Sequence, residues 1–355
     1  MPASLASALT LSTIGLASRT FLKLTTKQFK VEGLPILLDA LKIPHNEKGK
    51  RKALGLRDQE GDDPTLRPRR GIVTICNHNS VVDDPMASVS GLVYENGLSV
   101  VCTQMWSLLP LTTYFPFATP AHTCRNNRWT LGASDIMFTN PTHSKFFTLG
   151  QVIETHRGSG IFQEAVDKAV KLLQDGNWIH IFPEGKVNQK LTNPNGGLFR
   201  FKWGIGRIIM DSTVMPEVIP MWISGFDQIM PETRGFPRFI PRPGANISIT
   251  IGKPLTSQIE SLMNSWREMA SKETGSLGIG GDWKQEATGE GLNGSEQRNV
   301  RGRGELIDGH EKEVRIGIVE VLQEGIRELG EDVERREGRF ENRLWSHSIR
   351  QEFKA

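Results

Sequence analysis

The sequence predicts an α/β fold, with a sheet flanked by helices and helical extensions at both ends of the chain. Short β-branched apolar segments, bounded by Gly, Pro and polar residues, recur along the middle of the chain and are typical of buried strands. An amphipathic helical stretch lies between two of them, and strands that alternate with helices indicate an α/β sheet enzyme. The chain has 355 residues, 37% of them hydrophobic, which is enough to bury a sizeable core.

Residues 1–44 are predicted to be a membrane-associating or targeting segment. Residues 3–24 are rich in Ala, Leu, Ser and Thr, with Arg19 and Lys23 as their only charges, and no acidic residue precedes Glu32. An interfacial helix, a targeting peptide and the first packed helix of the domain would each have this composition. The chain contains no run of eighteen uncharged apolar residues, so a transmembrane helix is not expected.

The predicted domain spans residues 71–271 and follows an exposed loop at residues 45–70, which is dense in charged residues, Gly and Pro. Strands are expected at residues 71–76, 98–102, 178–182, 217–223 and 246–251. Residues 163–175 place apolar side chains on one helical face and end at an Asp-Gly stop signal. Pro220 lies inside one strand, which predicts that this strand is at a sheet edge or contains a bulge.

The composition changes after the domain. Residues 272–304 are rich in Gly, Ser, Glu, Asn and Arg and have few apolar residues, which predicts a disordered insertion. Residues 305–355 are expected to be a helical segment that packs on the domain, because apolar residues recur at helical spacing over residues 311–336.

Charge and cysteine content argue against two classes of function. A net charge of +3 is too small to indicate nucleic-acid binding. The three cysteines, Cys76, Cys102 and Cys124, have the spacing of neither a zinc site nor a disulfide framework, so no metal is expected. Cys76 and Cys102 end apolar runs, and we expect buried free thiols there.

His78 and Asp83 are the candidate catalytic pair. Two residues five apart lie roughly 140° apart on a helix and on opposite faces of a strand. They can meet only if the chain turns between them, as it would if a strand ended at His78 and a helix began near Asp83. A carboxylate held against one imidazole nitrogen leaves the other to deprotonate an alcohol, which then attacks an ester or thioester carbonyl. A structural His with a chance Asp neighbour is the alternative interpretation.

Two other turns contain candidate ligand-binding residues. Glu184 and Gly185 follow a predicted strand, at the sheet edge where open α/β sheets usually bind ligands. Arg157 and Gly158 lie in a Gly-containing turn that leads into a helix; Arg offers a planar fork of donors for phosphate, and Gly lets the backbone approach. A solvated Glu in a capped turn and a surface Arg at a helix entry are the alternatives.

The order His-x4-Asp, Arg-Gly, Phe-Pro-Glu-Gly and Val-Ile-Pro resembles that of the glycerolipid acyltransferase superfamily. Within it, the tafazzin family is the closer resemblance, through residues 128–140, 143–147 and 178–188. Many superfamily members follow Phe-Pro-Glu-Gly with Thr-Arg-Ser, whereas Lys186-Val187-Asn188 stands here, as in tafazzins. The resemblance covers roughly residues 70–260 and does not extend to residues 272–304.

The resemblance implies a glycerolipid acyltransferase-like sheet and a lipid-remodelling enzyme. Such an enzyme exchanges acyl chains between a phospholipid and a lysophospholipid, typically cardiolipin and monolysocardiolipin, without coenzyme A or another cofactor. It also implies a peripheral or monotopic protein of the mitochondrial membrane, facing the intermembrane space. His78 is then the base and Asp83 its orienting partner. The residues that shape the glycerophosphate site are then Arg157, Gly158, Glu184 and Gly185.

Two other functions fit the same sequence. A coenzyme A-dependent acyltransferase acting on lysophosphatidic acid or a related acceptor would use the same four motifs. A non-enzymatic membrane-binding protein would use the N-terminal segment and residues 108–121, which carry no charge. That apolar, Pro-containing stretch is expected either to insert into an anionic lipid surface or to form a bent core loop. The sequence leaves the oligomeric state and the acyl-chain preference open.

Overall fold

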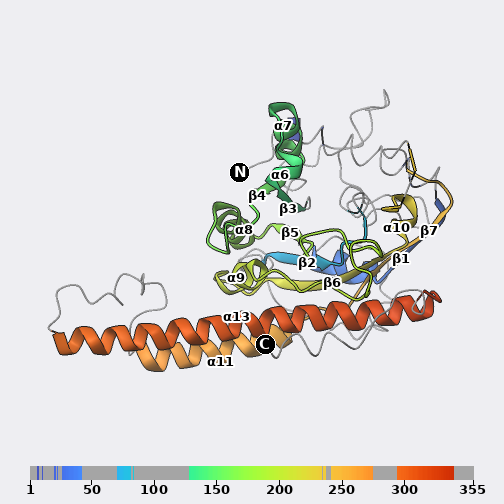
Figure 1. The fold of residues 1–355 in the computed structure, drawn as a ribbon. Coiled ribbons are helices and arrows are strands. Elements are labelled where there is room, and N and C mark those ends of the chain that lie inside the picture. Colours follow the sequence, from blue (N-terminus) through green and yellow to red (C-terminus); the bar gives the residue numbers. More distant parts are fainter. Residues whose placement is uncertain are drawn as a thin grey trace, which may run out of the picture.

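The computed structural model describes residues 26–41, 70–80, 83, 128–233, 235–236, 241–274 and 294–339, together with residues 6, 7, 10, 20 and 22. Its described part contains one seven-stranded sheet, in the order β1-β7-β6-β2-β5-β3-β4 (Figure 1). The strands are β1 (Thr26–Glu32), β2 (Ile72–Cys76), β3 (Trp129–Ala133), β4 (Val152–Thr155), β5 (Trp178–Ile181), β6 (Glu217–Ser224) and β7 (Ala245–Ile251). β6 and β7 run antiparallel, and the other neighbouring pairs run parallel.

Helices cover both faces of this sheet, so the predicted α/β class is confirmed (Figure 1). They are α2 (Leu34–Ala40), α6 (Ser134–Met137), α7 (Pro141–Leu149), α8 (Glu164–Gln174), α9 (Gly204–Met210), α10 (Phe226–Ile229), α11 (Thr256–Thr274) and α13 (Gly294–Arg336). Side chains of α8, α9, α11 and α13 form the core on one face, and those of α2 and α10 form the core on the other. The short helices α6 and α7 lie beside β3 and β4.

The central strand β2 belongs to both cores. Val73 and Ile75 face the side of α8, α9, α11 and α13, whereas Ile72 and Cys76 face the side of α2 and α10. Successive side chains of a strand point to opposite faces, and all five residues of β2 are buried. Burial on both faces is typical of parallel sheets in α/β proteins. Cys76 is a buried free thiol, as the sequence predicted.

Pro220 lies in an interior strand, so the prediction of a sheet edge or a bulge at this position is wrong. β6 pairs with β2 at Pro220, whose register partner is Ile75, but it pairs with β7 only from Met221 onward. The Pro220 carbonyl points toward the end of β7, where it accepts a hydrogen bond from the Gly252 N–H (2.8 Å). An N–H group at this residue would point the same way, beyond the β6–β7 ladder, so proline removes no ladder bond.

The helix α13 has 43 residues and is about 65 Å long at 1.5 Å per residue. α11 packs against it in the antiparallel direction, because Leu262 lies against Gly317 and Leu255 against Gly325. Figure 1 shows the two helices side by side under the sheet, with the N-terminal part of α13 extending past it. Within the described residues, neither of them nor any other helix combines the length and apolarity needed to cross a bilayer.

Some predicted segment limits differ from those in the structure. Residues 26–40, inside the predicted membrane-associating or targeting segment, form β1 and α2 of the domain itself. β1 pairs with β7, and α2 buries three leucines in the core, so tertiary contacts override a weak local pattern. The insertion predicted at residues 272–304 overlaps the end of α11 and the start of α13. α13 corresponds to the predicted C-terminal helical segment, and its apolar side chains pack on the sheet.

Several sequence predictions fall outside the described residues. They concern the loop at residues 45–69, the strand at 98–102, the apolar stretch at 108–121, Cys102 and Cys124.

Candidate active site

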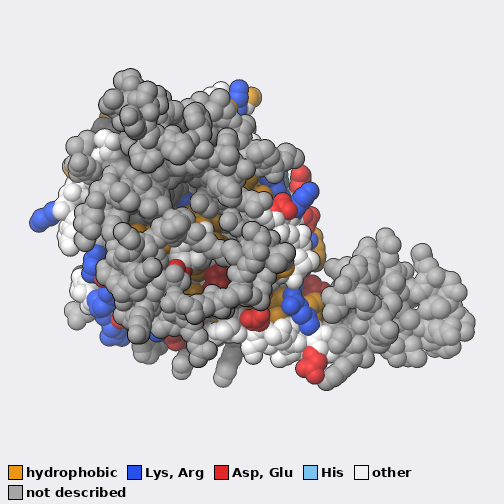
Figure 2. All heavy atoms as spheres, turned by 180° about the vertical axis from the view of Figure 1, so that it is seen from behind, with side chains coloured by type: hydrophobic (Ala, Val, Ile, Leu, Met, Phe, Trp, Pro, Cys, Tyr) orange, Lys and Arg blue, Asp and Glu red, His pale blue; other side chains and the backbone are white. Residues whose placement is uncertain are grey.

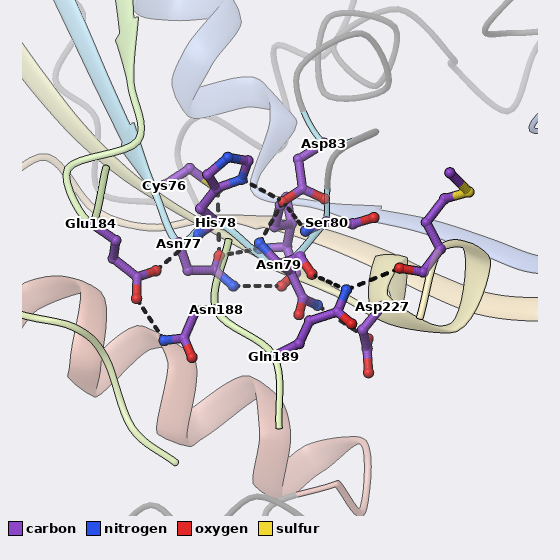
Figure 3. A network of polar contacts seen from close by, with 12 residues as sticks. Cys76, Asn77, His78, Asn79, Ser80, Asp83, Glu184, Asn188, Gln189 and Asp227 are labelled. Atoms are coloured by element: carbon purple, nitrogen blue, oxygen red, sulfur yellow. Dashed lines mark hydrogen bonds and ion pairs between the residues drawn. The ribbon is translucent and has the colours of Figure 1, made fainter. Parts of the chain in front are cut away.

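The candidate site lies where β2 ends (Figure 3). β2 stops at Cys76, and residues 77–80 that follow have no regular structure. A hydrogen bond from the Asp83 N–H to the Ser80 carbonyl (3.1 Å) turns the chain back. His78 Nδ1 therefore lies 3.1 Å from Asp83 Oδ2. The structure thus brings together the two side chains that the sequence predicted would meet in a turn.

The Asp83 carboxylate is fully buried, with 0% of the residue exposed. Besides contacting His78, its Oδ2 accepts hydrogen bonds from the main-chain N–H groups of Asn79 (2.5 Å) and Ser80 (2.6 Å). Burial raises the pKa of Asp83 above its ordinary value, and the hydrogen bonds from His78, Ser80 and Asn79 oppose this effect. The two main-chain bonds hold the carboxylate in one orientation, which fixes its geometry relative to His78.

The His78 ring is supported by aromatic side chains of β5 and the turn after it. It stacks on Phe182, with centroids 4.5 Å apart and an interplanar angle of 27°. Phe182 in turn meets His180 edge-on, with centroids 4.7 Å apart. The His78 side chain is 20% exposed, so the ring is partly buried but still accessible from solvent. With Nδ1 on Asp83, Nε2 is the ring nitrogen left for a substrate.

His180 is a structural residue beneath this stack. It is 1% exposed, and its Nδ1 lies 2.7 Å from the Thr74 hydroxyl, which also accepts a hydrogen bond from Trp178 Nε1 (2.8 Å). Burial, with a smaller effect of the Arg128 and His78 charges, lowers the pKa of His180 well below its ordinary value. Burial thus favours the neutral form of His180, whose contact with Thr74 links β5 to β2.

Glu184 lies two residues after Phe182 and is 1% exposed. Its Oε1 accepts a hydrogen bond from the His78 N–H (2.9 Å), and its Oε2 accepts one from Asn188 Nδ2 (2.6 Å) and one from the Phe199 N–H (2.9 Å). Burial raises the pKa of Glu184, and these hydrogen bonds oppose the effect. Both oxygens thus bind donors of the chain itself, and the substrate-binding role of Glu184 stays a prediction.

Gly185 permits the turn after Glu184. Its φ angle of 70° lies in the left-handed region that favours glycine. The Lys202 side chain passes 3.2 Å from the place where a Cβ atom would stand, and the Lys202 N–H donates to the Pro183 carbonyl (2.8 Å). The left-handed backbone and the nearby Lys202 side chain therefore explain why glycine occupies position 185.

Arg157 and Gly158 lie away from the His78–Asp83 pair. They follow β4, the edge strand, and β5 and β3 separate β4 from β2. The Arg157 side chain is 49% exposed and pairs with Asp135 of α6 at 3.2 Å. Gly158 has a φ angle of 84° and open space around it. Within the described residues, neither of the two contacts His78, Asp83 or Glu184.

A cavity of about 600 Å³ lies beside the His78–Asp83 pair. Its lining includes Asn77, His78, Glu184, Asn188, Asp227 and Arg339, but neither Arg157 nor Gly158. Apolar side chains, such as Leu191 and Pro231, line it as well, so the cavity offers both polar and apolar contacts. Figure 2 shows the molecule from behind, with hydrophobic and acidic side chains of the described residues visible near its centre. No group of three or more His, Cys, Asp or Glu within the described ranges is placed to hold a metal ion.

Three amide side chains of the site were missed by the sequence interpretation. Asn77 exchanges two hydrogen bonds with the main chain of Ile223 (2.8 and 2.9 Å), which extends the β2–β6 pairing by one residue. Gln189 Nε2 donates to the Asn79 carbonyl (2.9 Å) and Asn188 Nδ2 to Glu184. A signal was available for Asn77, because an amide directly after a strand is typical of a turn with side-chain hydrogen bonds. Asn188 and Gln189 lie several residues past the end of β5 and had no such signal.

The chain is similar to several known proteins. Residues 60–224 match the acyltransferase family, and this range includes every site residue predicted from the sequence. A tafazzin of Dictyostelium discoideum is 36% identical over 194 residues, which are 54% of this chain and 56% of that protein. A tafazzin of Drosophila melanogaster is 36% identical over 196 residues, which are 54% of this chain and 42% of that protein.

A third relative is named for a different activity. The N-acylphosphatidylethanolamine synthase of Arabidopsis thaliana is 32% identical over 197 residues, which are 55% of this chain and 59% of that protein. The chain thus spans about half the length of the curated relatives it matches. These similarities confirm the resemblance to the tafazzin family.

Proposed function

This chain is a homologue of the tafazzins with an acyltransferase-family region at residues 60–224, and on that premise we propose that it is a phospholipid–lysophospholipid transacylase that works without coenzyme A. His78 is the general base, and Asp83 orients it. The observation that carries the proposal is the 3.1 Å contact between His78 Nδ1 and Asp83 Oδ2, beside a cavity of about 600 Å³.

The proposed reaction moves one acyl group and needs no further reactant. His78 Nε2 takes the proton of the lysophospholipid hydroxyl as its oxygen attacks the ester carbonyl of the donor phospholipid. The tetrahedral intermediate expels the glycerol oxygen of the donor, which takes the proton from the imidazolium. One ester bond forms, one breaks, and the base is regenerated. The Asp83 carboxylate stabilises the imidazolium between the two proton transfers.

Cardiolipin and monolysocardiolipin are the proposed substrate pair. The tafazzin relatives support this choice, as does Lys186-Val187-Asn188 in place of the Thr-Arg-Ser of many superfamily members. Such lipids stay in the bilayer, so the enzyme works at a membrane surface. We place it on a mitochondrial membrane, facing the intermembrane space and attached peripherally or monotopically.

The acyl donor is the feature to test first. Purified protein is given phosphatidylcholine with a labelled acyl chain, together with monolysocardiolipin, and no coenzyme A. The expected result is labelled cardiolipin that accumulates with time and with protein concentration. A folded protein that produces none contradicts the proposal.

Two parallel reactions identify the alternative functions. One supplies labelled acyl-coenzyme A and lysophosphatidic acid, and transfer in this reaction alone indicates a coenzyme A-dependent acyltransferase. The other supplies phosphatidylethanolamine as the acceptor, because the Arabidopsis relative is named for its N-acyl product. Label in an amide that resists mild alkaline hydrolysis, with none in cardiolipin, indicates acyl transfer to the amine.

A further inference from the structure

The main chain of His78 is held on both sides by the loop that follows β5 (Figure 3). Its N–H donates to Glu184 Oε1 (2.9 Å), and its carbonyl accepts a hydrogen bond from the Asn188 N–H (2.7 Å). His78 lies two residues past the end of β2, where no sheet ladder fixes the backbone. The position of the base therefore depends on this loop.

The two residues that hold His78 are also tied to each other. Asn188 Nδ2 donates to Glu184 Oε2 (2.6 Å) and to the Gly197 carbonyl (2.8 Å), while Asn188 Oδ1 accepts a hydrogen bond from Asn193 Nδ2 (3.1 Å). Since a buried carboxylate with fully used oxygens has little freedom to rotate, Glu184 and Asn188 form one rigid support. We refer to this pair as the His78 clamp.

The same loop also sets the direction of the imidazole ring. Phe182, two residues before Glu184, stacks on the ring, and Asp83 binds its Nδ1. The clamp therefore fixes the backbone, and these two contacts fix the ring plane. A displacement of about 1 Å in a reacting group can cost on the order of a hundredfold in rate.

We propose that Glu184 and Asn188 are positioning residues for His78 and that Glu184 does not bind the lipid headgroup. The inference rests on the proposed function, because the position of His78 matters only if it is the base. An anionic phosphate at Glu184 would have to displace a donor from a buried carboxylate and would meet a like charge, both of which are unfavourable. The sequence had assigned Glu184 to the glycerophosphate site by resemblance.

The test compares Glu184→Gln and Asn188→Ala with the native enzyme in the transacylation assay. In Glu184→Gln an amide nitrogen, which is a donor, replaces one carboxylate oxygen. In one orientation it faces the His78 N–H, and in the other it faces Asn188 Nδ2 and the Phe199 N–H, so a hydrogen bond is lost in either case. Asn188→Ala keeps the main-chain bond to His78 and removes only the side-chain bonds. Glu320→Gln, on the exposed face of α13, is the matched control.

The expected result is a fall in kcat of about 10- to 100-fold in Glu184→Gln and a smaller fall in Asn188→Ala. The KM for the lysophospholipid should change less than about threefold in both, because positioning acts in the transition state. A KM that rises tenfold or more, with kcat unchanged, overturns the proposal and makes Glu184 a headgroup ligand. If Glu184→Gln does not fold, Asn188→Ala decides the matter by the same criteria.

A spectroscopic readout separates this inference from the proposed activity. The imidazole signals of His78 are assigned by NMR from their loss in His78→Gln, and the Nδ1–H proton is compared across the variants. We expect this signal to shift or broaden in Glu184→Gln and Asn188→Ala but not in Glu320→Gln. An unchanged signal in both clamp variants overturns the proposal even if the native protein transfers no acyl chain.

Discussion

Replacing Asp83 by Asn removes one charge, changes the volume little, and so isolates the orienting contact with His78. The Asn carbonyl oxygen can occupy the Oδ2 position and keep the two hydrogen bonds from the Asn79 and Ser80 N–H groups. Its amide nitrogen then takes the Oδ1 position, for which no partner is found among the described residues. The fold around the turn is preserved, but the imidazolium of the intermediate loses its negative partner.

The expected effect is large on the rate and small on stability. A general base contributes about 10²- to 10⁴-fold, and the same change in a Ser-His-Asp triad lowers kcat about 10⁴-fold. At 1.36 kcal/mol per tenfold, this corresponds to about 2.7 to 5.4 kcal/mol of transition-state stabilisation. The unfolding free energy should stay within about 1 kcal/mol of the native value, since an amide replaces a fully buried charge but keeps the main-chain bonds.

The assay is the initial rate of labelled acyl transfer at saturating acceptor, with urea unfolding measured on the same preparations. Asp175→Asn, at an exposed residue that follows α8, is the matched control and should keep the native rate. A folded Asp83→Asn protein whose rate lies within threefold of the native rate refutes the assignment of Asp83 as the orienting partner.

Two further predictions concern stability. The pKa of Glu184 is raised above 4.5 in the folded chain, so just above that pH the folded chain binds more protons than the unfolded chain. The unfolding free energy of the native protein, relative to that of Glu184→Gln, should therefore fall as the pH rises above 4.5. Urea titrations at several pH values measure this, and a relative gain with pH contradicts it. Gly330→Ala should lower the unfolding free energy by about 1–3 kcal/mol, since its Cβ would stand 2.4 Å from the buried Trp222 ring. In Gly309→Ala, on the same helix, the new Cβ meets no atom within 4 Å, so this change should be neutral or stabilising by up to about 1 kcal/mol. Equal melting temperatures for the two variants would contradict the close packing of Gly330 on Trp222.

The His78–Asp83 contact was predictable because stereochemistry leaves few ways to join residues five apart. Because a buried strand ends just before His78, Asp83 can reach it only after a turn, and the structure contains that turn. The strands β2, β5, β6 and β7 were predictable for a similar reason: each is a short apolar segment with clear boundaries.

The roles of Glu184 and Arg157 depend on contacts that no local pattern encodes. Glu184 binds the N–H of a residue 106 positions away, and the position of Arg157 depends on the order of strands in the sheet. The sequence places both at strand ends, but it does not state which strand ends are neighbours. β5 is next to β2, and β4 is at the edge, so only the first of these two motifs reaches His78 in the described structure.

The strand β1 and the interior position of Pro220 could not be predicted from the sequence, because both depend on which strands pair. Residues 26–32 contain charged and polar side chains and form a strand by pairing with β7 at the sheet edge. Pro220 sits in an interior strand because its missing N–H points past the end of a neighbour. In each case the register of the sheet, and not the residue type, decided the outcome.

The most direct test of the proposed mechanism is the rate of acyl transfer from phosphatidylcholine to monolysocardiolipin by His78→Gln, compared with the native protein in the same vesicles at pH 7. Removal of the base should lower the initial rate by at least about a hundredfold while the protein stays folded. A folded His78→Gln protein that transfers acyl chains within twofold of the native rate would remove His78 from the chemistry, and the function of the clamp with it.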